Sequence, residues 1–172
     1  MAVFFSTRTD EELEEIYRRH ADTVYRVCFS FMKNPADTED MVQETFLRLL
    51  SSGKAFSSWE HEKAWLIVTA ANACKDALKH WWRRGEDLAS CQCLAEDVPF
   101  EIDGVLSAIL ALPPDYKEAV YLYYCEGYST PEIAKMLHRP QSTVRSRLAR
   151  ARKLLEKSVW EGGETHDKSG DS

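Results

Sequence analysis

The chain has 172 residues, 44% hydrophobic and 29% charged, which allows one or two small domains with hydrophobic cores. A formal net charge of −6 excludes a general nucleic-acid coat, which would be basic over its whole surface. No apolar run reaches the length of a membrane span and the N-terminus lacks a signal pattern, so we expect a cytoplasmic protein without membrane insertion.

The charge is unevenly distributed along the chain. Met1–Glu101 carries 12 basic and 18 acidic residues, whereas 139–157 carries 7 basic residues and 1 acidic residue. Any binding to nucleic acid must therefore be local and oriented.

Five cysteines are present, an odd number that argues against a disulfide framework. Cys28, Cys74 and Cys125 fall on predicted helices at apolar-compatible positions, so we expect buried thiols. Cys91 and Cys93 lack a second pair at metal-ligand spacing. We therefore expect no metal and no cofactor.

The first two predicted helices span 10–32 and 38–50, separated by Asn34-Pro35, with Asp37 as the cap of the second. On a helical wheel, one side of the second helix is apolar, with Val42, Thr45, Phe46 and Leu49. The other side carries Asp40, Gln43, Glu44 and Leu47. This side is either a contact surface or a solvated face with one stray leucine, and its residues alone do not separate the two.

A serine-rich segment, 51–62, is predicted to be a loop that exposes Phe56 and Trp59. The third predicted helix, 63–84, has an inner stripe of Ile67, Ala70, Ala71, Cys74, Ala77, Leu78 and Trp81. Its outer stripe is Trp65, Thr69, Asn72, Asp76, Lys79 and Arg83. Aromatic, amide and basic groups in one line are typical of a single-strand binding platform. The alternative for Trp65 is simple packing against the loop.

The segment 85–101 is acidic, rich in small residues and without periodicity, so we expect a flexible linker. Helices are predicted over 102–112 and 115–126, the second closed by Gly127. Their core residues are Leu112, Ala119, Val120, Leu122 and Tyr123. The tail, 161–172, is polar and predicted to be disordered.

The segment 127–155 predicts a helix-turn-helix. Ser129 and Glu132 form an S-x-x-E capping box, with Pro131 in the first turn of a helix over 130–137. Pro140 ends the turn, and Gln141 or Ser142 is the expected cap of the next helix.

This last helix is amphipathic and basic. Its packing stripe is Val144, Leu148, Ala151 and Leu155, and the opposite arc holds Ser142, Arg145, Ser146, Ala149, Arg150 and Lys153. Small residues between arginines suit an element that lies in a DNA major groove. The alternative is a solvated amphipathic helix.

The predicted fold is therefore all-α, with two small helical domains joined by a flexible linker and a helix-turn-helix in the second. A stand-alone helix-turn-helix transcriptional regulator is the competing function. Such a protein would carry an α/β domain ahead of the helix-turn-helix, and the alternating strand pattern is missing from 1–84. No glycine-rich phosphate loop, triad or metal cluster indicates an enzyme.

Three segments, in this order, resemble bacterial RNA polymerase sigma factors of the extracytoplasmic-function type: DTEDMVQETFLRLL, AWLIVTAANACKDALKHWWRR and LPPDYKEAVYLYYCEGYSTPEIAKMLHRPQSTVRSRLARARKLL. The resemblance covers about 11–157 and implies region 2 over 1–84 and region 4 over 102–160. It implies binding to core RNA polymerase (β′ clamp helices and β flap), to promoter DNA and to an anti-sigma factor.

The resemblance also implies roles for single residues. Asp40, Gln43, Glu44 and Leu47 would meet the β′ clamp helices. Asn72 and Asp76, with the loop around Phe56, would help to capture a flipped minus-10 base. Arg145, Ser146, Ala149 and Arg150 would read the minus-35 element. The chain departs from the family at His80, Trp81 and Trp82, where relatives usually carry arginines, so we expect fewer phosphate contacts there.

Overall fold

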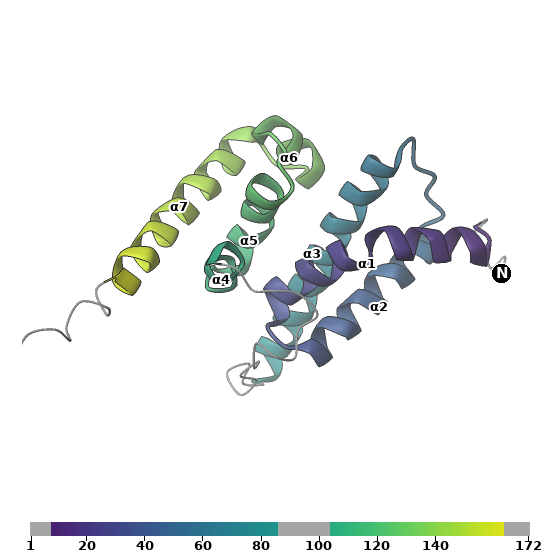
Figure 1. Ribbon diagram of the computed structural model, residues 1–172, viewed down its shortest axis with the longest axis horizontal. Helices are drawn as coiled ribbons and strands as arrows, with labels where there is room; N and C mark the ends of the chain where they lie inside the picture. The colour runs from purple at the N-terminus through teal and green to yellow at the C-terminus, as the bar shows by residue number, and fades with distance from the viewer. Residues whose placement is uncertain (1–7, 86–103, 164–172) are drawn as a thin grey trace, which may run out of the picture. The chain divides into compact units, whose positions relative to one another are not determined.

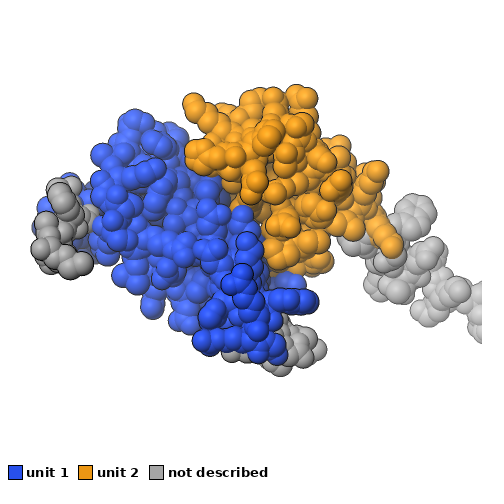
Figure 2. All heavy atoms as spheres, turned by 180° about the vertical axis from the view of Figure 1, so that it is seen from behind, with its two compact units in different colours: residues 1–101 blue, residues 102–172 orange. Residues whose placement is uncertain are grey.

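The computed structural model describes residues 8–85 and 104–163, with side chains over 8–85 and 107–157. The chain divides into two compact units, Met1–Glu101 and Ile102–Ser172 (Figures 1 and 2). The described residues form helices and no strands, so the predicted all-α fold with two units is confirmed. The predicted linker, apart from Gly85, and the tail from 164 onward lie outside the described residues.

Unit 1 contains three helices, α1 (Asp10–Met32), α2 (Pro35–Ser52) and α3 (Trp59–Arg84). Each of them packs against the other two. Val24, Cys28, Leu49, Leu66 and Cys74 are buried between them. The helical spacing of these apolar residues is what allows all three helices to contribute to one core.

Side-chain caps define where the helices of unit 1 begin. Thr9 and Glu12 form a reciprocal capping box at α1. The Asp37 N–H donates to Asn34 Oδ1 at 2.9 Å, so Asn34 is the cap of α2 and the expectation of Asp37 was wrong. Pro35 can enter the first turn because its missing N–H has no partner there anyway. Ser58 caps α3, which therefore begins at Trp59 and not at 63.

Unit 2 contains α4 (Gly104–Leu110), α5 (Pro114–Val120), η3 (Tyr121–Cys125), α6 (Thr130–Leu137) and α7 (Gln141–Gly163). The long α7 packs against α4, α5 and α6. Ile109, Leu122, Ile133, Val144 and Ala151 are buried in the core of this unit.

The segment after α5 is a π-helix, which the sequence pattern did not predict. The Glu126 N–H donates to the Tyr121 carbonyl, five residues back. This wider turn shifts the side-chain register, so Tyr121 is buried while Tyr123 is 37% exposed. Cys125 is exposed too. The prediction that Tyr123 and Cys125 are buried was therefore wrong.

The predicted capping box of the helix-turn-helix is present. The Glu132 carboxylate accepts from the Ser129 N–H at 2.7 Å, and this bond lowers the pKa of Glu132. His138 ends α6 in the left-handed region, with φ 51°. The Pro140 carbonyl accepts from Thr143 and Val144, so α7 begins at Gln141. The expected capping by Gln141 or Ser142 was wrong because both lie inside the helix.

Candidate functional site

One side of α7 packs into unit 2, as the sequence predicts. Val144, Leu148 and Ala151 are buried and Leu155 is half-buried. The opposite arc is solvent-exposed and consists of Ser142, Arg145, Ser146, Ala149, Arg150 and Lys153. The structure thus presents the six predicted DNA-contacting residues of this helix together on its free side.

Two hollows divide this exposed arc. Ser142, Ser146 and Arg150 line a hollow of about 500 Å³ beside Asp115 and Tyr116 of α5. Arg145 and Ala149 line a hollow of about 230 Å³ on another side, with Tyr123 and Thr130. The helical wheel showed one basic face, and in the structure Arg145 and Arg150 of that face line different hollows.

Sequence reasoning missed Arg152, which lines the same hollow as Arg145. Its Nε donates to the Tyr124 hydroxyl at 3.4 Å, and this bond raises the pKa of Arg152. Arg145, Ala149 and Arg152 recur at helical spacing, which was the available signal. Arg147 is half-buried and lies 3.9 Å from the buried carboxylate of Glu118, so it faces the protein.

In unit 1, the predicted polymerase-contacting residues lie at one surface of α2. Asp40 and Gln43 are exposed, and Leu47 is 57% exposed. Leu47 is part of a hollow of about 560 Å³, lined also by Tyr17 and Tyr25 of α1 together with Glu39, Val42, Gln43, Phe46 and Leu50. The Tyr17 ring lies 4.9 Å from that of Phe46 and remains 49% exposed. Leu47 is thus not an isolated apolar side chain, because it lines one hollow with Tyr17 and Phe46.

Glu44, the fourth member of that set, is only partly exposed because Arg48 holds it. Arg48 Nε lies 2.9 Å from Glu44, and its terminal nitrogen lies 3.6 Å from Asp76 of α3. The predicted polymerase-contacting and minus-10-contacting sets therefore meet at one arginine, which sequence reasoning did not single out.

The outer stripe of α3 has two kinds of residue. Asn72, Asp76, Lys79 and Arg83 are exposed along the helix. Trp65 is half-buried, with its ring 5.7 Å from that of Phe56. Trp65 therefore packs against the loop, which was the alternative to a role in binding a single strand. Phe56 is half-buried too and also meets the His61 ring at 5.4 Å, edge to face.

A buried polar pair joins α1 to α3 close to this loop. His20 Nε2 lies 2.8 Å from Glu62 Oε1, and Arg19 reaches the same carboxylate oxygen at 3.2 Å. Burial lowers the pKa of His20, while the hydrogen bond and charge of Glu62 oppose that shift. The imidazole is therefore a neutral structural link at physiological pH.

Within residues 8–85 and 104–163 no group of His, Cys, Asp or Glu could hold a metal ion. Cys28 and Cys74 are buried, and His80 is exposed. Cys91 and Cys93 lie outside the described residues. No helix in the described part of the chain is long and apolar enough to cross a membrane.

Comparison with known proteins gives matches to both units. The family model of Sigma-70 region 2 matches residues 16–84, and that of Sigma-70 region 4 matches residues 102–155. The chain is 35% identical to the ECF RNA polymerase sigma factor SigE of Mycolicibacterium smegmatis over 83% of its own length, but spans only 59% of that protein. It is 30% identical to RNA polymerase sigma factor CarQ of Myxococcus xanthus, over 91% of this chain and 94% of CarQ.

A solved structure shares the fold. The sigma factor RpoE of Bartonella quintana, crystallised with the anti-sigma factor NepR, superposes with a TM-score of 0.66 at 20% identity. That alignment covers 87% of this chain and 97% of RpoE.

Proposed function

The chain belongs to the extracytoplasmic-function (ECF) RNA polymerase sigma factors, and on this premise we propose how its two units act. The chain binds core RNA polymerase and directs promoter-specific initiation of transcription. Unit 1, with region 2 over 1–84, binds polymerase and recognises and melts the minus-10 element. Unit 2, with region 4 over 102–160, recognises the minus-35 element. The observation that carries this division is that each unit presents its own exposed contact face on a packed helix.

The polymerase contact of unit 1 is the surface of Asp40, Gln43, Glu44 and Leu47 on α2, which meets the β′ clamp helices. Its chemistry supports this role. An exposed leucine beside the Tyr17 ring supplies apolar area for a hot spot, and acidic groups at the edge supply orientation. The hollow adds Tyr17, Tyr25 and Leu50 to the surface that a partner helix would cover.

The minus-10 contact is the outer face of α3 together with the loop Gly53–Ser58. Asn72 and Asp76 supply hydrogen-bonding groups for base edges, and Lys79 and Arg83 supply charge for phosphates. Phe56, with Trp65 packed behind it, supplies an aromatic surface for an unstacked base.

The minus-35 contact is the exposed arc of α7. Arg145 and Arg150 reach guanine edges or phosphates, and small Ser146 and Ala149 allow close approach to the groove floor. Ser142 and Lys153 complete the arc near its two ends. Because unit 1 is acidic, the attraction to duplex DNA is concentrated in this helix.

Two further partners follow from the family. RpoE was crystallised with an anti-sigma factor, and we propose that a protein of that kind also holds this chain inactive. The β flap of polymerase is the proposed partner of unit 2. We infer that the chain acts in the cytoplasm, because its proposed partners are promoter DNA and polymerase.

A stand-alone regulator is the weaker alternative. In the described residues, unit 1 consists of three helices and is not the α/β domain that such a regulator would carry ahead of its helix-turn-helix.

In vitro run-off transcription with core polymerase and a promoter library tests the proposal. Core polymerase alone should give no specific transcript, and addition of the chain should select promoters that share two elements at fixed spacing. Binding to DNA without any stimulation of polymerase would contradict the proposal and favour the regulator.

A further inference from the structure

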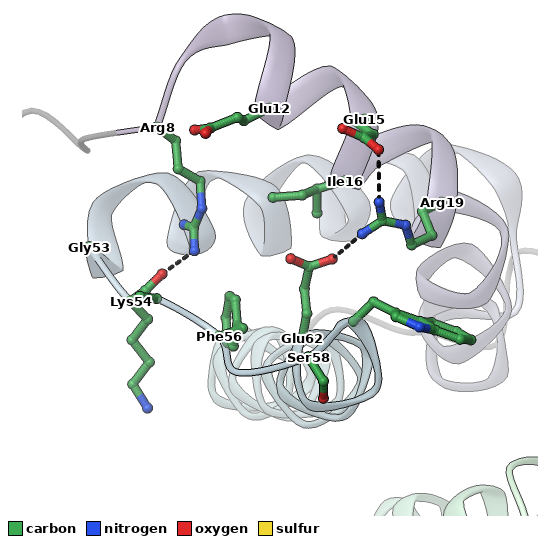
Figure 3. A pocket seen from close by; sticks show the side chains of 12 residues that line it. Arg8, Glu12, Glu15, Ile16, Arg19, Gly53, Lys54, Phe56, Ser58 and Glu62 are labelled. Atoms are coloured by element: carbon green, nitrogen blue, oxygen red, sulfur yellow. Dashed lines mark hydrogen bonds and ion pairs between the residues drawn. The ribbon is translucent and has the colours of Figure 1, made fainter.

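Arg8 reaches from the segment before α1 to the loop that precedes α3. One guanidinium nitrogen donates to the Leu49 carbonyl at 3.4 Å, and the other donates to the Lys54 carbonyl. The same group lies over the Phe56 ring, 5.3 Å from its centroid. Figure 3 shows Arg8 directed at Lys54, with Phe56 nearby at the edge of the same pocket.

The two carbonyls belong to the end of α2 and to the loop that follows it. Leu49 is one of the last four residues of α2, whose carbonyls have no amide partner within the helix, and its carbonyl accepts from the Ser52 hydroxyl at 2.8 Å as well as from Arg8. Gly53 then turns the chain through the left-handed region, with φ 60°, and Lys54 follows. A planar guanidinium has donors in a fixed fork, so one side chain can hold both the helix end and the loop.

The position of Phe56 depends on this loop, which contributes no regular secondary structure between Gly53 and Ser58. The Phe56 ring contacts the Trp65 and His61 rings of α3. It also lies under the guanidinium of Arg8, which comes from the segment before α1. Removing Arg8 would take away the contact that ties the Phe56 ring to the segment before α1. A more mobile loop would have to be ordered at the moment of binding, which weakens binding.

We propose that Arg8 is a positioning residue for minus-10 recognition: it fixes the loop Gly53–Ser58 and the Phe56 ring in the conformation that receives an unstacked base. This inference rests on the proposed role of Phe56. It also assigns a function in promoter recognition to a residue outside the span matched by the region 2 family model, 16–84.

Substitutions of Arg8 can distinguish positioning of the loop from simple attraction of phosphate, because only the guanidinium has donors in a fixed fork. Arg8→Lys keeps the positive charge but presents one compact ammonium group in place of the fork. Arg8→Met removes the charge and keeps an apolar stem. Arg18 offers a matched control, because it is exposed on α1 and pairs only locally with Glu14 at 2.5 Å. Arg18→Met changes the net charge of unit 1 by the same amount without affecting the loop.

The experiment measures holoenzyme made with the full chain and core polymerase. Its probe is a single-stranded oligonucleotide selected by wild-type holoenzyme from a randomised pool, and the same oligonucleotide with each base replaced in turn. Arg8→Met and Arg8→Lys should both bind the selected strand about tenfold more weakly and should discriminate less at one base position. Hydrogen exchange of the peptide 53–58 should be faster in both variants, while affinity for core polymerase and the binding by Arg18→Met stay as in wild type.

Equal binding by Arg8→Lys and wild type, with loss only in Arg8→Met, would show charge attraction and overturn the inference. Wild-type binding by both variants would overturn it as well. Phe56→Ala separates the role of Arg8 from the role of Phe56. Loss of binding with Phe56→Ala but not with Arg8→Met overturns only the role of Arg8, whereas wild-type binding by Phe56→Ala overturns the proposed role of Phe56 and this inference with it.

Discussion

The Nε2 atom of His20 lies 2.8 Å from the Oε1 atom of Glu62, in the buried contact between α1 and α3. His20 is 2% exposed and Glu62 is 7% exposed. A protonated imidazole at this position would need water that the core does not supply, which is why burial outweighs the attraction of the carboxylate and lowers the pKa of His20.

This pair makes the stability of unit 1 depend on pH. The unfolded chain takes up a proton on His20 near its ordinary pKa of 6.5, and the folded chain resists that proton. The unfolded state therefore binds more protons, so the contribution of this pair to stability is full well above pH 6.5 and is lost as the pH falls through 6.5 towards the lowered pKa of the folded chain. Urea unfolding followed by tryptophan fluorescence measures this, since Trp59, Trp65, Trp81 and Trp82 all lie in unit 1.

His20→Gln should flatten this part of the pH profile, because glutamine does not titrate. His80→Gln is the matched control, since His80 is exposed in the same unit and should leave the profile as in wild type. A His20→Gln profile that runs parallel to that of wild type would contradict the prediction.

The minus-35 face is tested by Arg145→Ala and Arg150→Ala. Each should weaken recognition of a cognate duplex by about 1–3 kcal/mol if it contacts a base edge. Because the two arginines line different hollows, we expect them to affect different positions of the element. Run-off transcription and duplex binding with single-position variants of the promoter measure both effects.

Val144→Ala provides the contrast, because Val144 is buried and should act through stability alone. If both arginine variants initiated like wild type at every promoter position, the assignment of this face to DNA would be wrong.

The polymerase surface is tested by Leu47→Glu combined with Asp40→Lys. Both side chains are exposed, so the double variant should lose binding to core polymerase and keep its helical content by circular dichroism. Leu49→Ala is the counterpart, since Leu49 is fully buried and should lose about 2–5 kcal/mol of stability. Unimpaired core binding by the double variant would remove this surface from the proposal.

The capping box of the helix-turn-helix is tested by Ser129→Ala. Losing the hydroxyl that accepts from the Glu132 N–H should destabilise α6 by about 1 kcal/mol. Hydrogen exchange of peptides over 130–137 should be faster in the variant. Ser107→Ala, at an exposed position of α4, should have no such effect. Equal exchange in Ser129→Ala and wild type would show that tertiary packing alone holds α6.

The end of α1 is tested by Lys33→Gly. Lys33 adopts φ 64°, a left-handed conformation that favours glycine. The left-handed strain of about 1–2 kcal/mol is partly offset by the entropy of glycine, so we expect about 0.5–1 kcal/mol of stabilisation in urea unfolding. Lys33→Ala removes the same side chain and keeps the strain, so it should not stabilise. A gain of equal size in both variants would point to the charge and not to the backbone.

Local sequence signals predicted most of the helices because the interactions that form them are local. The period of the apolar residues predicted 10–32 as α1, and the S-x-x-E box predicted α6, since both act within one or two helical turns. Periodicity also assigned the exposed and buried sides of α2 and α7. The predicted starts of α2 and α3 were wrong, because Asn34 and Ser58 compete with neighbouring residues that could also cap a helix.

The tertiary structure decided what depends on contacts between distant residues. The π-helix at Tyr121–Cys125 changes which tyrosine is buried, and a wheel that assumes one helical period cannot show it. The two hollows beside α7 exist because α5 and α6 pack on different sides of it.

The candidate site divides in the same way. Sequence by itself determined most of the exposed residues of α2, α3 and α7, because exposure on a helix follows from its period, but it did not show that Glu44 and Trp65 are partly covered. Only the tertiary structure placed Tyr17 beside Leu47, joined Glu44 to Asp76 through Arg48, and brought Arg8 over Phe56. These residues lie on separate elements, and no local rule relates them, because packing of the whole unit is what brings their side chains within reach.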